Sequence, residues 1–233
     1  MKKIGLVGGM TPESTTAYYQ MLIDLGRESW DDPLHNPVVL IYSIDLAEMV
    51  AHQDVGDGDR VAELLVDALE KLRIAGAEVG ALTANTPHVF FDRIQSGTTL
   101  PLISIVDTTL DHTRNLGVGR ALLLGTNATM TGAMYPDAFT AEGIEIVTPG
   151  GDDREFINHS IYAELAAGTV TPELRQQYLE ICSRQIEDRA VDAVILGCTE
   201  IPLVLRPGDL PVPLIDTAQC HAAALFAHAV AVN

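Results

Sequence analysis

Cysteine, aromatic residues and long apolar runs are all scarce in this 233-residue sequence. The three cysteines, Cys182, Cys198 and Cys220, lie far apart without CxxC spacing or an even-numbered framework, so a reducing cytoplasm fits best. No run approaches the roughly 18 apolar residues that a membrane helix needs. The N-terminus enters a strand-like segment directly, without a signal-peptide pattern. We therefore expect a cytoplasmic protein with no membrane partner.

Basic residues are also few, because 14 lysines and arginines stand against 32 aspartates and glutamates, for a formal charge of −18. Such a surface repels phosphate backbones, and one tryptophan with five phenylalanines offers no evident platform for stacking bases. We therefore expect no nucleic-acid partner. An acidic substrate would also be repelled at long range, so local donors would have to overcome this field.

What the chain does contain is an alternation of short apolar runs and longer amphipathic stretches. This is the pattern of βα units around parallel sheets, and a chain that is 47% hydrophobic can bury a real core at this length. Helices are expected between the strands, among them Asp59–Ala75, which ends at the C-cap residue Gly76, and Thr217–Val230. Thr11 and Pro12 predict another helix start. The strands are expected at Ile4–Val7, Val38–Ser43, Val79–Thr83, Leu102–Ile105, Ala121–Leu124, Ile144–Val147, Ala193–Leu196 and Val212–Ile215.

Two segments of the chain are repeated at nearly the same offset. Lys3–Gly9 matches Arg120–Thr126, since each has a basic residue, an apolar strand and a glycine turn. Glu78–Asn85 matches Asp192–Thr199, since each has an acid, an apolar strand and a turn of small or polar residues. Two matches at almost the same offset predict two lobes of similar topology.

The expected fold is therefore α/β, with two pseudo-symmetric lobes whose parallel-type sheets are flanked by helices. We expect the first lobe to span residues 1–105 plus 210–233 and the second to span 106–209. Open α/β sheets bind ligands outside the carboxyl ends of their strands, so the sequence predicts an active-site cleft between the lobes. The repeat pairs Ala84 with Cys198.

In the first lobe, two turns carry candidate ligands for an anion. The turn containing Gly9 and Met10 follows a strand and opens a helix, so its backbone N–H groups suit a carboxylate; a tight strand-to-helix turn is the alternative. Asn85 and Thr86 are candidate hydrogen-bond donors in the other turn, and ordinary capping is the alternative there. His88 is expected to be structural, bonding a carbonyl.

In the second lobe, Thr126 and Thr129 are candidate ligand donors, and Cys198 is the most informative residue. Its thiol follows a buried strand, and a helical turn after it would lower the thiol pKa through the helix dipole. The alternative is a buried inert cysteine, which is our interpretation of Cys182 and Cys220. No HExxH, paired-His or clustered Cys/His pattern indicates a metal site.

Four segments then resemble a known family, in order and over almost the whole chain. They are Ile4–Thr15, Asn85–His88, Gly125–Met130 and Leu196–Ile201, and together they are similar to the aspartate/glutamate racemases. The first and last segments are the specific ones, and the Gly-Thr segment is weaker.

The resemblance implies an isomerase that racemises amino acids without pyridoxal phosphate, metal or other cofactor, often as a homodimer. In the family, one cysteine lies on each side of the substrate. One thiolate removes the α-proton and the opposite thiol returns a proton to the other face, while donors stabilise the enolate-like intermediate. The substrate-binding residues that we expect on this basis are Gly9, Met10, Asn85, Thr86, Thr126, Thr129, Thr199, Glu200 and His159.

The sequence departs from the family pattern at two places. The family usually has a cysteine immediately before the Asn-Thr pair, where this chain has Ala84. Cys198 is then the one catalytic thiol, and Thr83 is a candidate for the missing acid/base although a hydroxyl is a weak one. Acidic-substrate members tend to place a lysine or arginine near the distal carboxylate, and the nearest candidate here is His159.

Three functions remain open at this point. The first is a racemase that combines Cys198 with a substitute such as water, Thr83 or a neighbour. The second is a single-thiol relative, either a decarboxylase of substituted malonates or a cis-trans isomerase. The third is a carboxylate-binding paralogue that lacks catalysis.

Overall fold

The computed structural model describes residues 1–231, apart from the side chain of residue 54. It divides into two compact units, which we call the first unit (Met1–Ile105 with the chain from His221 onward) and the second unit (Val106–Cys220). Each is a mixed α/β unit with a parallel sheet flanked by helices, as the sequence predicts.

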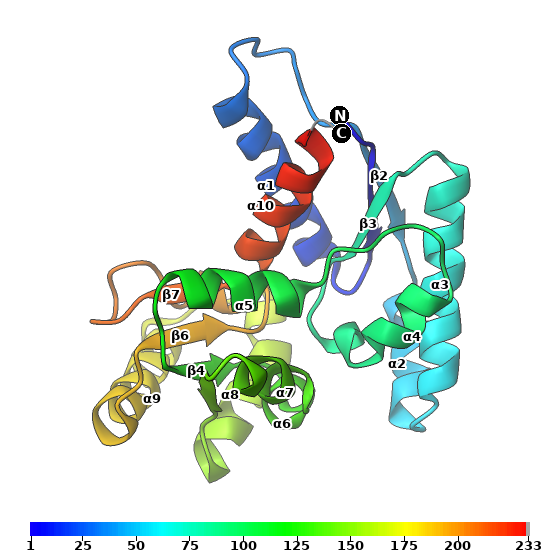
Figure 1. Ribbon diagram of the computed structural model, residues 1–233. Coiled ribbons are helices and arrows are strands. Elements are labelled where there is room, and N and C mark those ends of the chain that lie inside the picture. Colours follow the sequence, from blue (N-terminus) through cyan, green and yellow to red (C-terminus); the bar gives the residue numbers. More distant parts are fainter. Residues whose placement is uncertain (232–233) are drawn as a thin grey trace. The chain divides into compact units, whose positions relative to one another are not determined.

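The first unit has a three-stranded parallel sheet in the order β2-β1-β3. Helices α1 and α10 lie along one face of this sheet and α3 and α4 along the other (Figure 1). Trp30, which follows α1, contacts Phe226 of α10 with ring centroids 5.5 Å apart. The elements are β1 (Ile4–Gly8), α1 (Pro12–Ser29), β2 (Val39–Ser43), α2 (Leu46–Asp54), α3 (Gly58–Ile74), β3 (Val79–Leu82), the 3₁₀ helix η1 (Thr86–Phe90), α4 (Phe91–Ser96) and α10 (Thr217–Val230).

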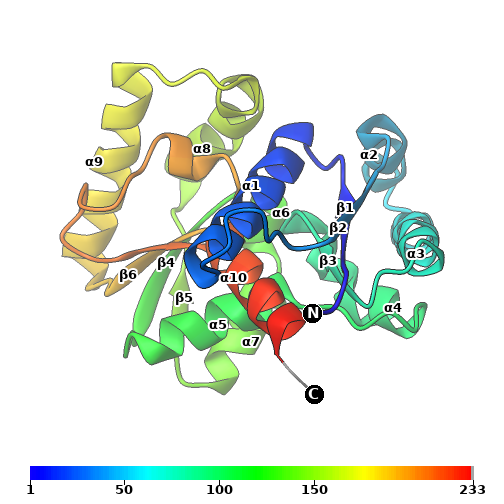
Figure 2. The same cartoon turned by 90° about the horizontal axis from the view of Figure 1, so that it is seen from above.

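The second unit has a four-stranded parallel sheet in the order β5-β4-β6-β7. Helices α5 and α7 lie on one face, and α8 and α9 lie on the other (Figure 2). The elements are α5 (Ile105–Asn115), β4 (Arg120–Leu124), α6 (Asn127–Thr131), α7 (Met134–Ala141), β5 (Glu145–Val147), α8 (Gly151–Ala163), η2 (Leu165–Ala167), α9 (Pro172–Arg189), β6 (Ala193–Leu196), η3 (Ile201–Leu203) and β7 (Leu214–Asp216).

The predicted repeat is visible in the two sheets, because β2-β1-β3 has the same order as β5-β4-β6. The residue that follows β3 and the residue that follows β6 make the same backbone bond to the middle strand of their sheet. Thr83 N–H donates to the Val7 carbonyl at 3.1 Å, and Gly197 N–H donates to the Leu124 carbonyl at 2.7 Å. The next residue along each turn is Ala84 in the first unit and Cys198 in the second, so the two occupy equivalent positions in the topology.

Local sequence signals set the ends of two helices as predicted. The Thr11 hydroxyl accepts a bond from Ser14 N–H at 3.2 Å, and Pro12 opens α1 at its first position. Helix α3 ends at Ile74, and Gly76 follows with φ of +100°, a conformation that glycine adopts without strain.

Two predictions differ from the structure. Leu102–Ile105 is not a strand, because only one bridge joins Leu102 to Gly80, Pro101 has no N–H to extend a ladder, and Ile105 already begins α5. The return to the first unit was predicted at residue 210, whereas it falls after Cys220. The reason is that β7 pairs with β6 and so belongs to the second sheet.

Alternating side chains of the second sheet fill its two faces. Leu122, Leu124 and Leu196 belong to a buried cluster with residues of α8 and α9, whereas Leu123 points to the opposite face.

Among residues 1–231, no helix combines the length and apolarity needed to cross a membrane.

Candidate active site

The glycine turn after β1 is built by contact with Thr15. A Cβ on Gly8 would lie 2.4 Å from Thr15 Cγ2, and Gly9 has φ of +87°. The Gly9 N–H donates to Thr15 Oγ1 at 2.8 Å, and Thr11 N–H donates to Ser14 Oγ at 3.3 Å. Two of the backbone N–H groups that the sequence offers to a carboxylate are therefore already bonded inside the turn, which agrees with the alternative of a tight strand-to-helix turn. The predicted ligand Met10 is 9% exposed and packs with the core of the first unit.

The strand β3 leads into Thr83, the candidate acid/base. Thr83 is fully buried, and its hydroxyl donates to the Val7 carbonyl at 3.2 Å. Its own carbonyl accepts a bond from Ser14 Oγ at 3.1 Å. The hydroxyl proton of Thr83 is thus committed to a backbone acceptor on β1, which suits a structural role.

The next three residues form the candidate carboxylate-binding turn. Ala84 and Thr86 are half-buried and Asn85 is 4% exposed. The Asn85 side chain makes no cap bond to η1, although capping was the ordinary alternative for it. The Asn85 carbonyl instead accepts a bond from His88 N–H at 2.9 Å.

His88 bonds a carbonyl, as the sequence predicts. Its Nδ1–H donates to the Ala84 carbonyl at 2.8 Å, and its Nε2 accepts a bond from Ile105 N–H at 3.2 Å. Burial, together with neighbouring His221, lowers the pKa of His88 to about 3, so the ring is neutral near pH 7.

In the second unit, the turn after β4 is the counterpart of the glycine turn. The Thr126 hydroxyl caps α6 by accepting a bond from Thr129 N–H at 3.4 Å, and the two threonine hydroxyls lie 3.2 Å apart. Both side chains are buried. A Cβ on Gly197 would lie 2.7 Å from the Leu124 carbonyl, so glycine permits the close approach of the two strand ends.

The thiol of Cys198 is hydrogen-bonded to a buried carboxylate. Sγ–H donates to Glu200 Oε2 at 2.9 Å, and the Thr199 hydroxyl donates to the same oxygen at 2.9 Å. Glu200 is only 6% exposed. This geometry fixes a thiol, a carboxylate and a hydroxyl within one short turn, a combination suited to moving a proton to and from sulfur.

The expected lowering of the Cys198 pKa is wrong. Burial and the Glu200 carboxylate raise the pKa of the thiol well above its ordinary value. The helical turn after Cys198 is the three-residue η3, which is too short for a strong dipole. At rest the sulfur therefore holds its proton, and a base must receive that proton before the thiolate can act.

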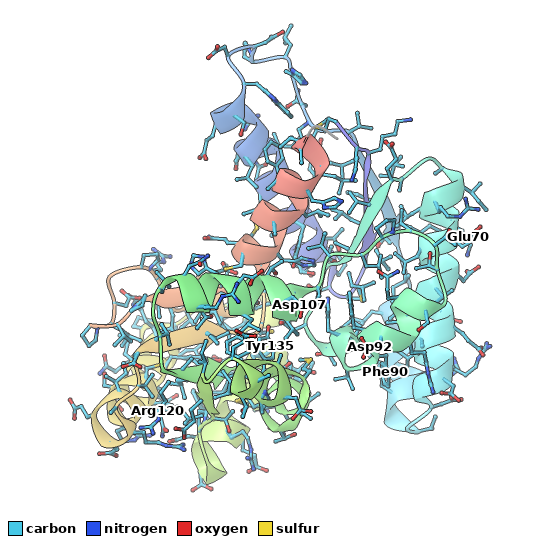
Figure 3. All side chains as sticks on the ribbon, viewed as in Figure 1. Glu70, Phe90, Asp92, Asp107, Arg120 and Tyr135 are labelled. Atoms are coloured by element: carbon cyan, nitrogen blue, oxygen red, sulfur yellow. The ribbon has the colours of Figure 1, made fainter. Side chains whose placement is uncertain are left out.

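Residues behind this turn also hold the end of β6. The Thr217 hydroxyl donates to the Leu196 carbonyl at 2.9 Å, and the hydroxyl of buried Tyr135 bonds to Thr109 and Thr217. Tyr135 lies below α5 (Figure 3). Sequence spacing does not predict this support, because it joins residues far apart in the chain.

The predicted ligand His159 lies exposed on α8. A residue one helical turn further on, Tyr162, was missed. Burial is the main cause that raises the pKa of Tyr162, and electrostatic interaction with Cys198 and Glu200 raises it further. The three-residue spacing from His159 would have placed Tyr162 on nearly the same helix face.

A cavity of about 510 Å³ opens in the first unit beside the glycine turn. Ser43 and Ile44 line it, and backbone atoms of Ile44 also approach Gly9. Its charged lining has more carboxylates than cations, namely Asp45, Glu48, Glu63 and Asp67 against Arg60 and Lys71. Both cations are already paired, at 2.6 Å with Glu63 and 2.5 Å with Asp67.

The described part of the chain contains no metal-binding cluster, that is, no group of three or more His, Cys, Asp or Glu side chains able to hold a metal ion.

Comparisons with known proteins agree on one family. A family model described as Asp/Glu/Hydantoin racemase matches residues 7–225. The broad specificity amino-acid racemase RacX of Bacillus subtilis (strain 168) is 26% identical over 94% of each chain. The crystal structure of a candidate Asp/Glu racemase from Yersinia pestis is 37% identical, with a TM-score of 0.92 over 99% of this chain and 100% of that one. An aspartate racemase homologue from Pyrococcus horikoshii OT3 is 36% identical, with a TM-score of 0.89 over the same shares.

Proposed function

Since the chain belongs to the Asp/Glu/hydantoin racemase family, we propose that it is a cofactor-independent amino-acid racemase in which Cys198 is the acid/base. The observation that carries this proposal is the bond between the Cys198 thiol and the buried Glu200 carboxylate. Because the raised pKa keeps the thiol protonated at rest, the thiolate forms only when a base accepts this proton. The Glu200 oxygen lies 2.9 Å from the sulfur and can accept it.

The proposed reaction begins with transfer of the thiol proton to Glu200. The Cys198 thiolate then removes the α-proton of the bound amino acid, which leaves a neutral thiol and a planar, enolate-like anion. Return of a proton from the same thiol regenerates the starting enantiomer. Inversion needs a donor on the other face, where Ala84 stands in place of the cysteine that the family resemblance implies, and a methyl group carries no exchangeable proton. We assign this step to a water molecule, which gives a proton to the opposite face of the anion, and the resulting hydroxide takes up the proton held by Glu200.

Glu200 therefore has a different proposed role from the one expected from the sequence. We assign it to the thiol rather than to the substrate, because its Oε2 already accepts two bonds from its own turn. Asn85, Thr86, Thr126 and Thr129 remain the proposed ligands of the substrate carboxylate. Thr83 is left out, because its hydroxyl proton is bonded to β1.

The charge of the first-unit cavity bears on the choice of substrate. Two of its four carboxylates are not matched by a cation, and this disfavours an anionic group inside that cavity, which lies beside the glycine turn but is lined by none of the proposed carboxylate ligands. RacX is described as acting with broad specificity. Neutral and basic amino acids therefore belong in the substrate panel together with aspartate and glutamate.

The test is α-proton exchange in deuterated water, followed by NMR, with both enantiomers of each amino acid in the panel. The enzyme is first dialysed against hydroxylamine and EDTA, which should leave its activity unchanged. Exchange should fall by about 10² or more in Cys198→Ala, the range expected for losing a general base. Cys220→Ala is the matched control and should retain activity. Exchange of no substrate, or undiminished exchange in Cys198→Ala, would reject the proposal.

A single-thiol decarboxylase is the second candidate, and the observation that favours it is the methyl group of Ala84. Protonating a carbanion after loss of CO₂ needs only one thiol. A substituted malonate that is decarboxylated by the wild type but not by Cys198→Ala, without exchange of any amino acid, would select this reaction.

A further inference from the structure

A pair of buried histidines in the first unit joins the candidate carboxylate-binding turn to the elements behind it. His88 donates from Nδ1 to the Ala84 carbonyl and accepts at Nε2 from Ile105 N–H. Its ring also stacks on Phe91, with centroids 5.3 Å apart and planes within 7°. Both ring nitrogens are thus used, and the ring has little freedom to turn.

His221 of α10 supports His88 from behind. Its Nε2–H donates to the Ile103 carbonyl at 2.8 Å, and its Nδ1 accepts from the Tyr18 hydroxyl at 2.9 Å. The two imidazole rings meet edge to face, with centroids 5.9 Å apart. The pair therefore connects the turn after β3 with α1, α10 and the start of α5, all in the same unit.

Both histidines are held in their neutral form. Burial lowers the pKa of His88 to about 3 and that of His221 to about 4. These bonds require opposite tautomers, with the proton on Nδ1 of His88 and on Nε2 of His221. Since Nε2 of His88 faces a backbone donor, this ring cannot exchange a proton there without breaking the bond to Ile105.

The turn needs such a support. Its 3₁₀ helix is short, and Asn85 provides no side-chain cap for it. The bond from His88 to the Ala84 carbonyl closes the turn from inside, across the two residues proposed to bind the substrate carboxylate.

We propose that His88 is a positioning residue, which fixes the Ala84–Thr86 backbone so that Asn85 and Thr86 meet the substrate carboxylate. The inference rests on the proposed function for the identity of the ligand. The proposed role of His88 affects substrate binding and does not involve the Cys198 thiol of the second unit. It also means that the backbone of residue 84 is placed by His88 whatever side chain that residue carries.

Two variants separate the two bonds of His88. In His88→Asn the amide nitrogen replaces Nδ1 and keeps the bond to Ala84, whereas the bond to Ile105 is lost. In His88→Gln the side-chain oxygen replaces Nε2 and keeps the Ile105 bond, whereas the Ala84 bond is lost. Each variant loses one hydrogen bond and the stacked ring, so the two are matched in their structural cost.

The KM for the best substrate of the panel should rise about tenfold in His88→Gln and stay within about threefold in His88→Asn, with kcat little changed in both. Backbone amides of residues 84–88 should exchange with deuterium faster in His88→Gln than in His88→Asn. Equal KM values in the two variants, or a fall in kcat alone, would overturn the inference.

A measurement on the wild type covers the case in which a variant does not fold. ¹⁵N NMR of the imidazoles should show His88 protonated at Nδ1 and neutral at pH 7. Protonation at Nε2 would remove the bond to Ala84 and reject the inference. If the wild type acts on no amino acid, the proposed function fails, and the tautomer and amide exchange then decide whether His88 holds the turn.

Discussion

The turns after β3 and β6 occupy equivalent places in two similar sheets, yet they are stabilised in opposite ways. In the first, the backbone at Ala84 is held by an imidazole and the side chain is an inert methyl group. In the second, the thiol of Cys198 is itself the bonded group, and its partner is the Glu200 carboxylate. In the first turn a side chain is bonded to the backbone, and in the second turn two side chains are bonded to each other.

Equivalent positions in the repeat therefore carry side chains with different bonding partners. The backbone bond to the middle strand is kept in both turns, through Thr83 and Gly197. The two turns differ in the residue that follows, Ala84 or Cys198, and in the groups from elsewhere in the chain that surround it. The backbone scaffold is thus the same in both units, whereas the side chains that follow it differ.

The largest expected effect comes from making the two turns alike. Ala84→Cys should increase the rate of inversion by about 10²-fold or more, because it supplies an acid/base on a backbone that His88 already fixes. Chiral chromatography of product from each enantiomer measures the gain. Ala84→Ser is the control, since its hydroxyl is too weak a base, and an equal gain in both variants would contradict the account.

The second prediction tests why the second turn begins with glycine. Gly197→Ala should lower the free energy of unfolding by about 1–3 kcal/mol, because the new Cβ would lie 2.7 Å from the Leu124 carbonyl. Gly150→Ala is the matched control, since its Cβ would meet nothing within 4 Å. Urea denaturation compares the two, and equal stability would show that the strand ends are free to separate.

The third prediction concerns the carboxylate beside the thiol. Glu200→Gln should lower the pKa of Cys198, since the Glu200 charge is among the causes that raise it. The pH at which iodoacetamide alkylates Cys198 should therefore move downward, as followed by peptide mass spectrometry. Alkylation of Cys220 in the same sample is the internal control. An unchanged profile for Cys198 would remove Glu200 from the proton path.

The smallest expected effect is a difference in acid stability between the units. The folded-state pKa values of His88 and His221 are about 3 and about 4, below the ordinary 6.5, so the unfolded chain binds more protons. The stability that these rings contribute is complete above pH 6.5 and declines as the pH falls toward 3. As the pH is lowered, deuterium exchange of the backbone amides in β3 and α1 should therefore accelerate before exchange in the second unit.

The second unit provides the comparison for this pH effect. Its histidines, His112 and His159, are both exposed, so the second unit contains no buried histidine. Amides of β6 and α9 should keep their protection at pH values where those of β3 have begun to lose it. Earlier loss in the second unit would show that the histidine pair does not govern acid stability.

Sequence patterns predicted the βα alternation, the repeat and the start of α1, because these depend on local spacing and capping. They also brought Ala84 and Cys198 to equivalent positions. They failed at Leu102–Ile105, where an apolar run makes one bridge only, and at β7, where sheet pairing decides which unit the strand joins.

The electrostatics of the candidate site were harder to foresee than its location. The direction of the Cys198 pKa shift depends on how deeply the turn is buried and on where the Glu200 carboxylate points, and neither follows from spacing. His221 and Tyr135 were missed for the same reason, since their partners lie far along the chain. Tyr162 could have been found from its spacing on α8.

The most direct test follows where deuterium appears when the wild-type enzyme acts on one pure enantiomer in deuterated water. If Cys198 is the one thiol acid/base, as proposed, deuterium should accumulate mainly in the starting enantiomer, well ahead of inversion. Equal labelling of both enantiomers from the first turnovers would mean that two competent acid/bases are present. That result, or the absence of any labelling, would contradict the account.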